Sequence, residues 1–447
     1  MATLPPTPAP ASTPTPASTQ AQVSISTPTP ASTSTPTLYW ADFVFAGEGP
    51  AIADGVVACG PSGEIVEVGP AAELLPRHVG AERVRLRGLL APGLVNAHTH
   101  LELSHLRGRV PGGDGFFAWV ESMMRARVNA AAADETLALE RALRELVDSG
   151  CVAVGEVTNS LGAVHAIARA NLGGSVFHEV FGLDRRVATE RLAGLGAQRA
   201  SVVGAWPAGG LAYAPAPHSL YSLHPDLVRA TLRAVRELGA RTSMHLGEHA
   251  AEREFLATGK GAMLPYAARF SLPVAEFPVP GLSPVAYARE LGALGPDVLV
   301  VHLTTATRAE LDLVAEAGSP LVLCPRSNLH IEGALPPLRE ALAAGLRPAL
   351  GTDSLASNDS LDVLAEALAF AEALPDVAPA TLWSMATAFG ADALGRPELG
   401  RLRPGANPGL VLHEGVVPPG ADPLLYFLRH GPADRRWARP RPDQVSP

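Results

Sequence analysis

Residues 90–100 of the chain read LAPGLVNAHTH, and this stretch decides the expected fold. An apolar run at 89–97 ends directly at two histidines, His98 and His100. If the run is an extended strand, side chains two residues apart point to the same face, so both imidazoles can hold one metal ion. The pair alone is weak evidence, because 14 histidines in 447 residues make this spacing common by chance.

The run at 89–97 is the first of eight, and most gaps between the runs carry amphipathic helical patterns, such as 227–238 and 308–317. Strands that alternate with helices indicate parallel βαβ units, and eight such units close a (β/α)8 TIM barrel. The sequence therefore predicts an α/β fold of this kind, with a last helix at 382–394. The other runs are 151–157, 175–181, 211–214, 242–246, 298–303, 320–324 and 348–351.

The domain organisation follows from composition. Short apolar runs separated by Gly and Pro at 38–90 indicate a small β unit, and 398–430 is expected to rejoin it, which gives a small β-sandwich domain formed from both chain ends. The catalytic barrel is expected at 91–397. Residues 1–37, almost entirely Thr, Pro, Ala and Ser, are expected to be disordered and show no secretory signal. The Pro- and Arg-rich tail at 431–447 receives no assignment.

Composition excludes several classes of protein. A net charge of −9 gives no basic footprint for nucleic acid. Three widely spaced cysteines predict neither a disulfide framework nor a cysteine-based zinc site. No apolar run reaches the length that spans a bilayer. We therefore expect a cytoplasmic protein that acts on a small molecule, without a nucleic-acid or membrane partner, and with a homodimer as a candidate assembly.

Further polar residues fall at the ends of the predicted strands. His245 ends the fifth run, His302 nearly ends the sixth, and Asp353 follows the eighth. Because the carboxyl ends of barrel strands form one rim, these side chains are expected to meet there. Imidazoles with a carboxylate suit one divalent ion, Zn²⁺ or Fe²⁺. Glu248, three residues after His245, can reach the same cavity and move a proton, or it is an exposed residue at a helix start.

Taken together, these segments resemble the amidohydrolase superfamily and, within it, the cytosine-deaminase/chlorohydrolase-like branch. The signature at 90–100 is accompanied by HLGE at 245–248, CPRSNL at 324–329 and GTDSLASND at 351–359, in the family's order. The match covers roughly residues 38–412. The resemblance implies a barrel fold and a metal-dependent hydrolase that deaminates cyclic amidines, acting on C–N bonds other than peptide bonds.

The resemblance also implies a role for each residue. His302 matches the histidine that orients the attacking water or the leaving group. Glu248 matches the carboxylate that protonates a ring nitrogen, and Asp353 accepts the proton of the water. His218, in a Pro-His-x-x-Tyr stretch, matches a substrate-contacting histidine, with a loop histidine held by backbone bonds as the alternative. The implied metal ligands are His98, His100, His245 and Asp353.

A single lysine separates two sub-classes of the superfamily. Binuclear members bridge two metals with a carbamylated lysine on the fourth strand. Lys260, the one lysine of the chain, follows His245 and cannot come from that strand. A mononuclear site is therefore expected.

The substrate is predicted from the resemblance of four short segments to one group of deaminases within the family. Some segments most resemble aminodeoxyfutalosine deaminases of the menaquinone pathway, which implies 6-amino-6-deoxyfutalosine as substrate and ammonia as product. Trp119 and its neighbours Phe116 and Phe117 flank a purine ring on this view, or are core residues of an amphipathic helix, which the pattern favours. Arg326 is a candidate for a substrate carboxylate. Adenosine, thiomethyladenosine, guanine and triazine substrates stay open. The segments are 100–104, 115–120, 155–160 and 325–328.

Two alternatives come from other classes of protein. Residues 245–249 spell H-x-x-E-H, the inverzincin metallopeptidase motif, which needs His245 and His249 on one helix face. The residues before His245 indicate a strand, and Gly247 would weaken a helix. A barrel that binds a ligand without catalysis is the second alternative, and the presence of every expected ligand argues against it.

Overall fold

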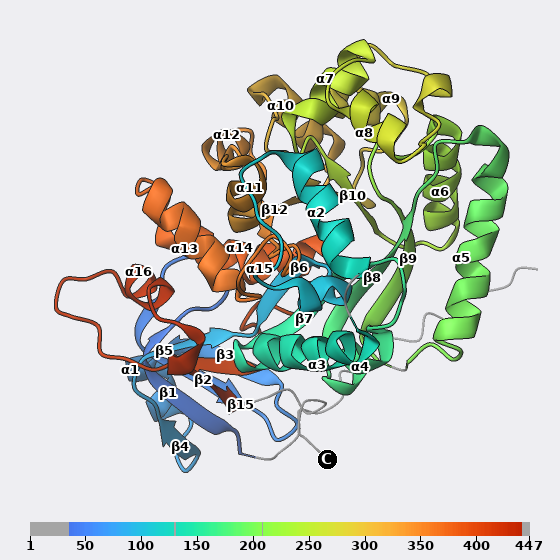
Figure 1. Cartoon of the computed structure of the whole chain (residues 1–447). Helices are drawn as coiled ribbons and strands as arrows, with labels where there is room; N and C mark the ends of the chain where they lie inside the picture. The colour runs from blue at the N-terminus through green and yellow to red at the C-terminus, as the bar shows by residue number, and fades with distance from the viewer. Residues whose placement is uncertain (1–34, 129–130, 208, 440–447) are drawn as a thin grey trace, which may run out of the picture. The chain divides into compact units, whose positions relative to one another are not determined.

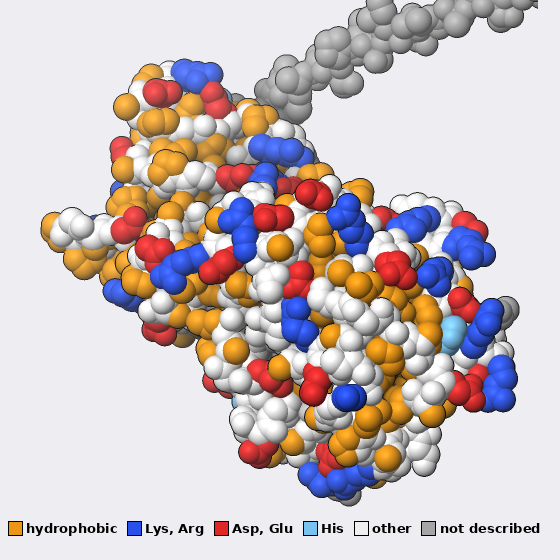
Figure 2. All heavy atoms as spheres, turned by 90° about the horizontal axis from the view of Figure 1, so that it is seen from above, with side chains coloured by type: hydrophobic (Ala, Val, Ile, Leu, Met, Phe, Trp, Pro, Cys, Tyr) orange, Lys and Arg blue, Asp and Glu red, His pale blue; other side chains and the backbone are white. Residues whose placement is uncertain are grey.

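A computed structural model of the chain describes residues 35–128, 131–207 and 209–439. The expectation of disorder at 1–37 falls almost wholly outside these residues, as does the end of the tail beyond 439. None of the helices in the described ranges combines the length and the apolar character needed to cross a membrane. On the face seen in Figure 2, acidic and basic side chains are interspersed with hydrophobic ones.

The barrel consists of two four-stranded parallel sheets, β6-β7-β8-β9 and β10-β11-β12-β13 (Figure 1). A bridge from Ser219 to His245 joins the end of β9 to β10, and a bridge from Thr99 to Asp353 joins the last strand to the first. The ring is therefore closed, and the predicted (β/α)8 barrel is confirmed. Its strands are β6 (Leu94–Thr99), β7 (Cys151–Thr158), β8 (Gly173–Val180), β9 (Leu211–Pro217), β10 (Thr242–Leu246), β11 (Val298–His302), β12 (Leu321–Leu323) and β13 (Ala349–Leu350).

The first predicted run, 89–97, is wrong as a single strand. It divides at Gly93 into β5 (Leu89–Pro92), which belongs to a separate sheet, and β6 of the barrel. A Cβ atom at Gly93 would lie 2.7 Å from the carbonyl oxygen of Pro408. The two parts of the fold approach so closely here that only glycine fits.

Helices follow most of the strands, as the sequence predicts. The helices expected at 227–238 and 308–317 are α6 (Pro225–Glu237) and α10 (Arg308–Ala317). The helix expected at 382–394 is instead two helices, α14 (Pro379–Met385) and α15 (Ala388–Ala393), because the backbone of Thr387 has a non-helical φ of −132° and ψ of −93°. The others are α1 (Ala71–Arg77), α2 (Phe116–Val128), α3 (Ala132–Asp148), α4 (Val164–Arg169), α5 (Ala188–Val202), α7 (Ala250–Thr258), α8 (Met263–Arg269), α9 (Pro284–Glu290), α11 (Pro325–Glu332), α12 (Leu338–Ala343), α13 (Val363–Ala373) and α16 (Pro423–Leu428).

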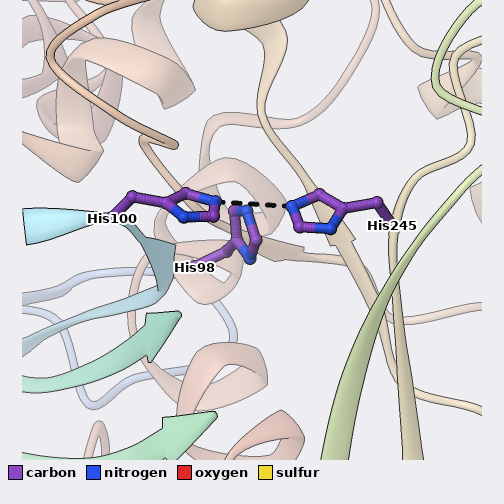
Figure 3. A group of neighbouring side chains, drawn as sticks. All are labelled: His98, His100 and His245. Carbon is purple, nitrogen blue, oxygen red and sulfur yellow. Dashed lines mark hydrogen bonds between the residues drawn. The ribbon is translucent and has the colours of Figure 1, made fainter. Parts of the chain in front are cut away.

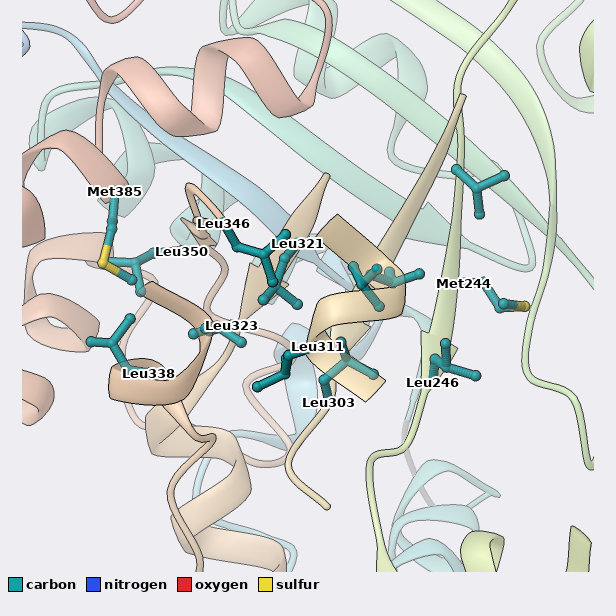
Figure 4. Packing of buried hydrophobic residues seen from close by; sticks show 14 of the residues in the cluster. Met244, Leu246, Leu303, Leu311, Leu321, Leu323, Leu338, Leu346, Leu350 and Met385 are labelled. Atoms are coloured by element: carbon teal, nitrogen blue, oxygen red, sulfur yellow. The ribbon is translucent and has the colours of Figure 1, made fainter. Parts of the chain in front are cut away.

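Because successive side chains of a strand point to opposite faces, each barrel strand directs some side chains outward to the helices and others to the interior. On β10, Met244 and Leu246 join the large cluster between the strands and the surrounding helices, while His245 between them lines the interior cavity. This alternation places the polar residue inside and keeps the barrel wall apolar outside. Figure 4 shows part of the outer cluster, including Met244, Leu246, Leu303, Leu311, Leu321, Leu323, Leu338, Leu346, Leu350 and Met385.

A separate seven-stranded sheet takes strands from both ends of the described chain, in the order β15-β14-β5-β1-β2-β3, with β4 paired to β1. The antiparallel pair β14–β5 aligns Leu412 with Leu90. Residues 435–439 of the tail, which the sequence left unassigned, form one of these strands. The predicted domain boundaries otherwise stay a prediction. The strands are β1 (Thr37–Val44), β2 (Ile52–Cys59), β3 (Ile65–Pro70), β4 (Glu82–Arg85), β14 (Leu410–His413) and β15 (Arg435–Arg439).

Candidate active site

The polar residues predicted at the strand ends lie on one rim of the barrel. His98 is on β6 and His100 directly follows it, while His245 is on β10. His302 is the last residue of β11, and Asp353 comes three residues after β13. The rim is the carboxyl end of the parallel strands, where barrel enzymes carry their active sites.

Three imidazoles converge in the middle of this rim (Figure 3). The Nε2 atoms of His100 and His245 are 3.4 Å apart, and the ring of His98 lies 5.0 Å from each of the other two rings. The Nδ1 of His245 donates to the carbonyl oxygen of His218 at 3.0 Å. The Nε2 of His245 therefore carries no proton, and its lone pair faces the other two imidazoles. His98 is fully buried, and neither of its ring nitrogens has a hydrogen-bond partner in the described structure. Imidazole nitrogens that face each other, those of buried His98 without a partner, form a fitting donor set for a cation.

Asp353 adds a carboxylate oxygen to this group. Its Oδ1 lies 3.6 Å from His98 Nε2 and 3.4 Å from His100 Nε2. Its Oδ2 accepts hydrogen bonds from Ser327 Oγ at 2.5 Å and Ser357 Oγ at 2.7 Å. Burial opposes the charged form, but His98 and the charges of His100 and His302 hold the pKa of Asp353 well below its ordinary value. The residue therefore presents one free anionic oxygen to the imidazoles.

The backbone at the rim is strained where these residues sit. Asp353 has a φ of 54°, His302 a φ of 77° and Leu303 a φ of 48°, all in the left-handed region that non-glycine residues rarely adopt. Such strain costs of order 1–3 kcal/mol per residue and tends to gather at functional sites. Gly351 makes the local approach possible, because a Cβ there would lie 2.6 Å from the Cβ of His98.

Glu248 lies beyond the end of β10, after Gly247 turns the chain with a φ of 59°. Its side chain is buried, and its Oε1 lies 3.7 Å from His302 Nε2. Burial, followed by the charge of Asp353, raises the pKa of Glu248 well above 4.5. A carboxyl whose pKa is raised keeps its proton to a higher pH than an ordinary glutamate, which suits a proton donor. Its backbone N–H donates to Glu252 Oε2 at 3.0 Å, which fixes the turn.

His302 is held by Asn328 on α11. The side-chain amide of Asn328 donates to His302 Nδ1 at 3.2 Å. Burial lowers the pKa of His302 to about 3, so the ring is neutral. With Nδ1 as acceptor, the ring proton is on Nε2, which points toward Glu248.

A cavity of about 600 Å³ opens over these residues. Its size lies within the usual range for sites that bind small molecules. One wall is apolar: Phe116 stacks on His249 with ring centroids 4.0 Å apart, and Phe117 stacks on Tyr266 at 4.6 Å. The helix α2 that carries both phenylalanines thus shapes the cavity, although the sequence pattern favoured a core role for them. The lining includes His100, Glu102, Phe116, Phe117, Trp119, Arg127, Asn159, Glu179, Arg191, His218, Tyr221, His245, Glu248, Tyr266, His302 and Asp353.

The predicted substrate contacts differ in where the structure places them. His218 lines the cavity, and its Nδ1 bonds to Ser222 Oγ at 2.8 Å, so its Nε2 edge is the one left for a ligand. Trp119 also lines the cavity, with its Nε1 donating to the Ala356 carbonyl at 3.3 Å.

Arg326 was predicted to meet a substrate carboxylate, but the structure places it outside the lining of the cavity. Its guanidinium forms an ion pair with Asp359, and the residue is not part of the cavity lining. Its position on α11 turns the side chain toward that exposed partner. The guanidinium groups that do line the cavity belong to Arg127 and Arg191.

Three residues near the metal-binding group were missed from the sequence. Glu179, at the end of β8, has its Oε1 3.7 Å from His245 Nδ1, and burial raises its pKa to about 8. A charged residue at the end of a buried strand was the available signal for it. Ser327 and Ser357 hold Asp353; both lie in segments that carry the resemblance, 324–329 and 351–359, but the sequence assigned neither of them a role. A second potential ligand group consists of Glu179, His218 and His245.

The H-x-x-E-H motif does not form a peptidase site. His249 is the N-cap residue of α7 and accepts from the Glu252 backbone N–H at 3.1 Å. His245 is on the preceding strand, so the two histidines do not share a helix face. Within the described residues, the candidate metal groups include His245 and exclude His249.

Comparisons with known proteins agree with this arrangement. A model of the "Amidohydrolase family" matches residues 89–431. Aminodeoxyfutalosine deaminase of Deinococcus radiodurans is 30% identical over 370 residues, which cover 80% of this chain and 85% of that protein. The 5-methylthioadenosine/S-adenosylhomocysteine deaminase of Moorella thermoacetica is 30% identical over 379 residues, with 81% and 82% covered.

A solved structure shows the same architecture. The crystal structure of Helicobacter pylori aminofutalosine deaminase in complex with methylthio-coformycin matches with a TM-score of 0.78 at 24% identity, over 88% of this chain and 96% of that one. At this level of identity the likeness establishes the fold.

Proposed function

The chain belongs to the amidohydrolase family as a hydrolytic deaminase that acts on C–N bonds, and we propose that it deaminates an adenosine-like aminopurine nucleoside at a single metal ion. One observation carries the proposal. Three imidazoles and the free oxygen of Asp353 converge in a cavity, where a buried acid, Glu248, faces the neutral His302 at 3.7 Å. This set supplies a cation site, a proton donor and a hydrogen-bond donor in one space.

The donor set fits one divalent ion. His98, His100, His245 and Asp353 Oδ1 would hold it, and mixed imidazole and carboxylate ligands suit Zn²⁺ first and Fe²⁺ second. When bound, such an ion lowers the pKa of a water molecule from about 15.7 toward about 7. The single lysine, Lys260, follows β10 and is absent from every barrel strand, which supports a mononuclear centre.

The protein's own groups then account for the proton movements. The oxygen of the water adds to the amino-bearing carbon of the substrate, and Asp353 accepts the proton that the water loses. Glu248 donates its own proton to the adjacent ring nitrogen. His302 Nε2 donates a hydrogen bond to the added oxygen. Asp353 next protonates the amino group, Glu248 takes the proton of the new hydroxyl, and the C–N bond breaks with release of ammonia. Both carboxyl groups end in their starting states.

Our best candidate for the substrate is 6-amino-6-deoxyfutalosine of the menaquinone pathway. Support comes from the Deinococcus relative and from the sequence segments around the first, second and seventh strands. The apolar wall of Phe116 and Phe117 suits a purine ring, while Arg127 and Arg191 suit a polar or anionic tail. The Moorella relative makes 5-methylthioadenosine and S-adenosylhomocysteine the second candidates.

A substrate panel tests the proposal. The zinc-loaded protein is incubated with aminodeoxyfutalosine, methylthioadenosine, S-adenosylhomocysteine, adenosine, guanine and a chloro-triazine, and ammonia or chloride release is measured. We expect the highest kcat/KM with the first compound. Release from guanine or the triazine alone, or from none of the panel, would refute the nucleoside assignment.

A further inference from the structure

The first turn of α11 contacts two residues of the site, the metal-ligand candidate Asp353 and the hydrogen-bond donor His302. We infer that Ser327 and Asn328, which are adjacent on this turn, are positioning residues: Ser327 sets the metal-facing oxygen of Asp353, and Asn328 sets the tautomer of His302. The role of Asn328 rests on the proposed function, whereas the role of Ser327 rests on the geometry of the metal-ligand candidates alone. Neither residue lines the cavity, so neither is placed to touch the substrate.

The serine contact controls how the carboxylate can turn. Ser327 Oγ and Ser357 Oγ lie 2.5 and 2.7 Å from Asp353 Oδ2, and 2.8 Å from each other. All three side chains are buried, and each hydroxyl has one proton to give. When both protons go to Oδ2, that oxygen is saturated and Oδ1 is left for the imidazoles. Rotation of the carboxylate would cost both buried hydroxyls their charged acceptor and leave them only neutral ones, Ser357 Oγ for Ser327 and the Ser354 carbonyl for Ser357, so the serines favour a one-oxygen mode of metal binding.

The asparagine contact controls the neighbouring imidazole. An amide nitrogen can only donate, so the 3.2 Å contact from Asn328 Nδ2 makes His302 Nδ1 an acceptor. The ring proton is therefore held on Nε2, 3.7 Å from Glu248 Oε1. The other tautomer would face the reaction with a lone pair and could not stabilise an added oxygen.

The turn is tied to the loop that carries Asp353. Glu366 on α13 accepts from the Arg326 backbone N–H at 2.9 Å and from Asn358 Nδ2 at 2.7 Å. Asn358 Nδ2 also donates to the Thr352 carbonyl at 2.9 Å. Through these bonds α11 and the loop at 352–358 are held as one unit, which gives Ser327 and Asn328 a fixed base from which to act.

The test separates the two roles within one helical turn. Zn²⁺ affinity is measured by competition with a chromophoric chelator, without substrate, for wild type, Ser327→Ala and Asn328→Ala. We expect Ser327→Ala to weaken Zn²⁺ binding roughly 10- to 100-fold, the usual effect of losing a residue that supports a ligand. We expect Asn328→Ala to bind Zn²⁺ within about twofold of wild type, yet to lose roughly 10- to 100-fold in kcat with little change in KM.

Matched variants and two outcomes complete the design. Ser384→Ala removes another buried serine, whose Oγ donates to the Ala380 carbonyl at 2.8 Å on α14, and should leave Zn²⁺ affinity unchanged. Ser357→Ala should repeat the effect of Ser327→Ala. Equal losses of Zn²⁺ affinity in Ser327→Ala and Asn328→Ala, or no loss in Ser327→Ala, would overturn the inference. If wild type deaminates no nucleoside while Ser327→Ala still binds Zn²⁺ weakly, the proposed function fails and the role of Ser327 stands.

Discussion

Glu248 Oε1 lies 3.7 Å from His302 Nε2, so a buried carboxyl and a buried imidazole face each other at the wall of the cavity. Burial favours the uncharged form of both groups: it raises the pKa of Glu248 and lowers that of His302 to about 3. Proton transfer from a buried acid is therefore the step on which the proposed chemistry depends most.

Replacing Glu248 with glutamine should remove that step. The amide keeps the size of the side chain but has no acidic proton, so we expect kcat to fall about 10²- to 10⁴-fold. Bound metal, measured by elemental analysis, should stay at the wild-type level. Glu254→Gln, an exposed change on α7, is the control. A Glu248→Gln enzyme with more than a tenth of wild-type turnover would contradict the role of Glu248.

Metal binding should depend on His98 and not on His249. Because ions that bind the folded state alone raise its stability, Zn²⁺ should raise the Tm of the wild-type protein, and a chelator should reverse the rise. His98→Ala should lose this Zn²⁺-dependent increase, whereas His249→Ala should keep it. The measurement is thermal unfolding with and without Zn²⁺. The reverse pattern would favour the peptidase motif at 245–249.

The stability of the protein should depend on pH through Glu252. Burial raises the pKa of this carboxyl from 4.5 to about 7. A raised carboxyl pKa means that the folded state holds its proton longer than the unfolded state, so stability falls as the pH rises from about 4.5 to about 7.

Glu252→Gln should remove this dependence. Relative to wild type, the variant should gain roughly 2–3 kcal/mol in its free energy of unfolding between pH 5 and pH 8. Urea unfolding at both pH values measures the difference, with Glu254→Gln as the exposed control. A constant difference between wild type and Glu252→Gln across this range would show that Glu252 does not retain its proton.

Substrate affinity should respond to Arg127 and not to Arg326. Arg127 lines the cavity, with its guanidinium 3.5 Å from Glu102 Oε1, while Arg326 forms its ion pair with Asp359. Loss of one charge-assisted hydrogen bond should raise KM about tenfold in Arg127→Ala. Arg326→Ala should stay within about twofold of wild type. Steady-state kinetics with the best substrate of the panel decide between the two arginines.

Much of this site could be predicted because its key residues mark the ends of apolar runs. His98, His245 and His302 each end or nearly end a run, and parallel strands bring their carboxyl ends together whatever the helices between them do. The eighth strand was predictable because its apolar run is likewise followed closely by a polar site residue, Asp353. Only two of its residues, Ala349–Leu350, are in the strand.

The residues that sequence reasoning missed or misplaced depend on tertiary contacts. Ser327 and Ser357 are small polar residues whose importance comes only from their distance to Asp353. The direction of Arg326 was set by Asp359, a partner 33 positions away that no periodicity reveals. The break at Thr387 and the split at Gly93 likewise arise where one part of the chain packs against another, which local patterns do not encode.

The pairing of β14 with β5 has a consequence for biosynthesis. Until residues 410–413 leave the ribosome, the edge of β5 has no partner there, and an unpaired strand edge is a template for association with other chains. The segment that leads into the first barrel strand thus stays unprotected through nearly the whole of translation. Chains cut short before residue 410 would keep that edge bare, so premature termination should yield aggregating products.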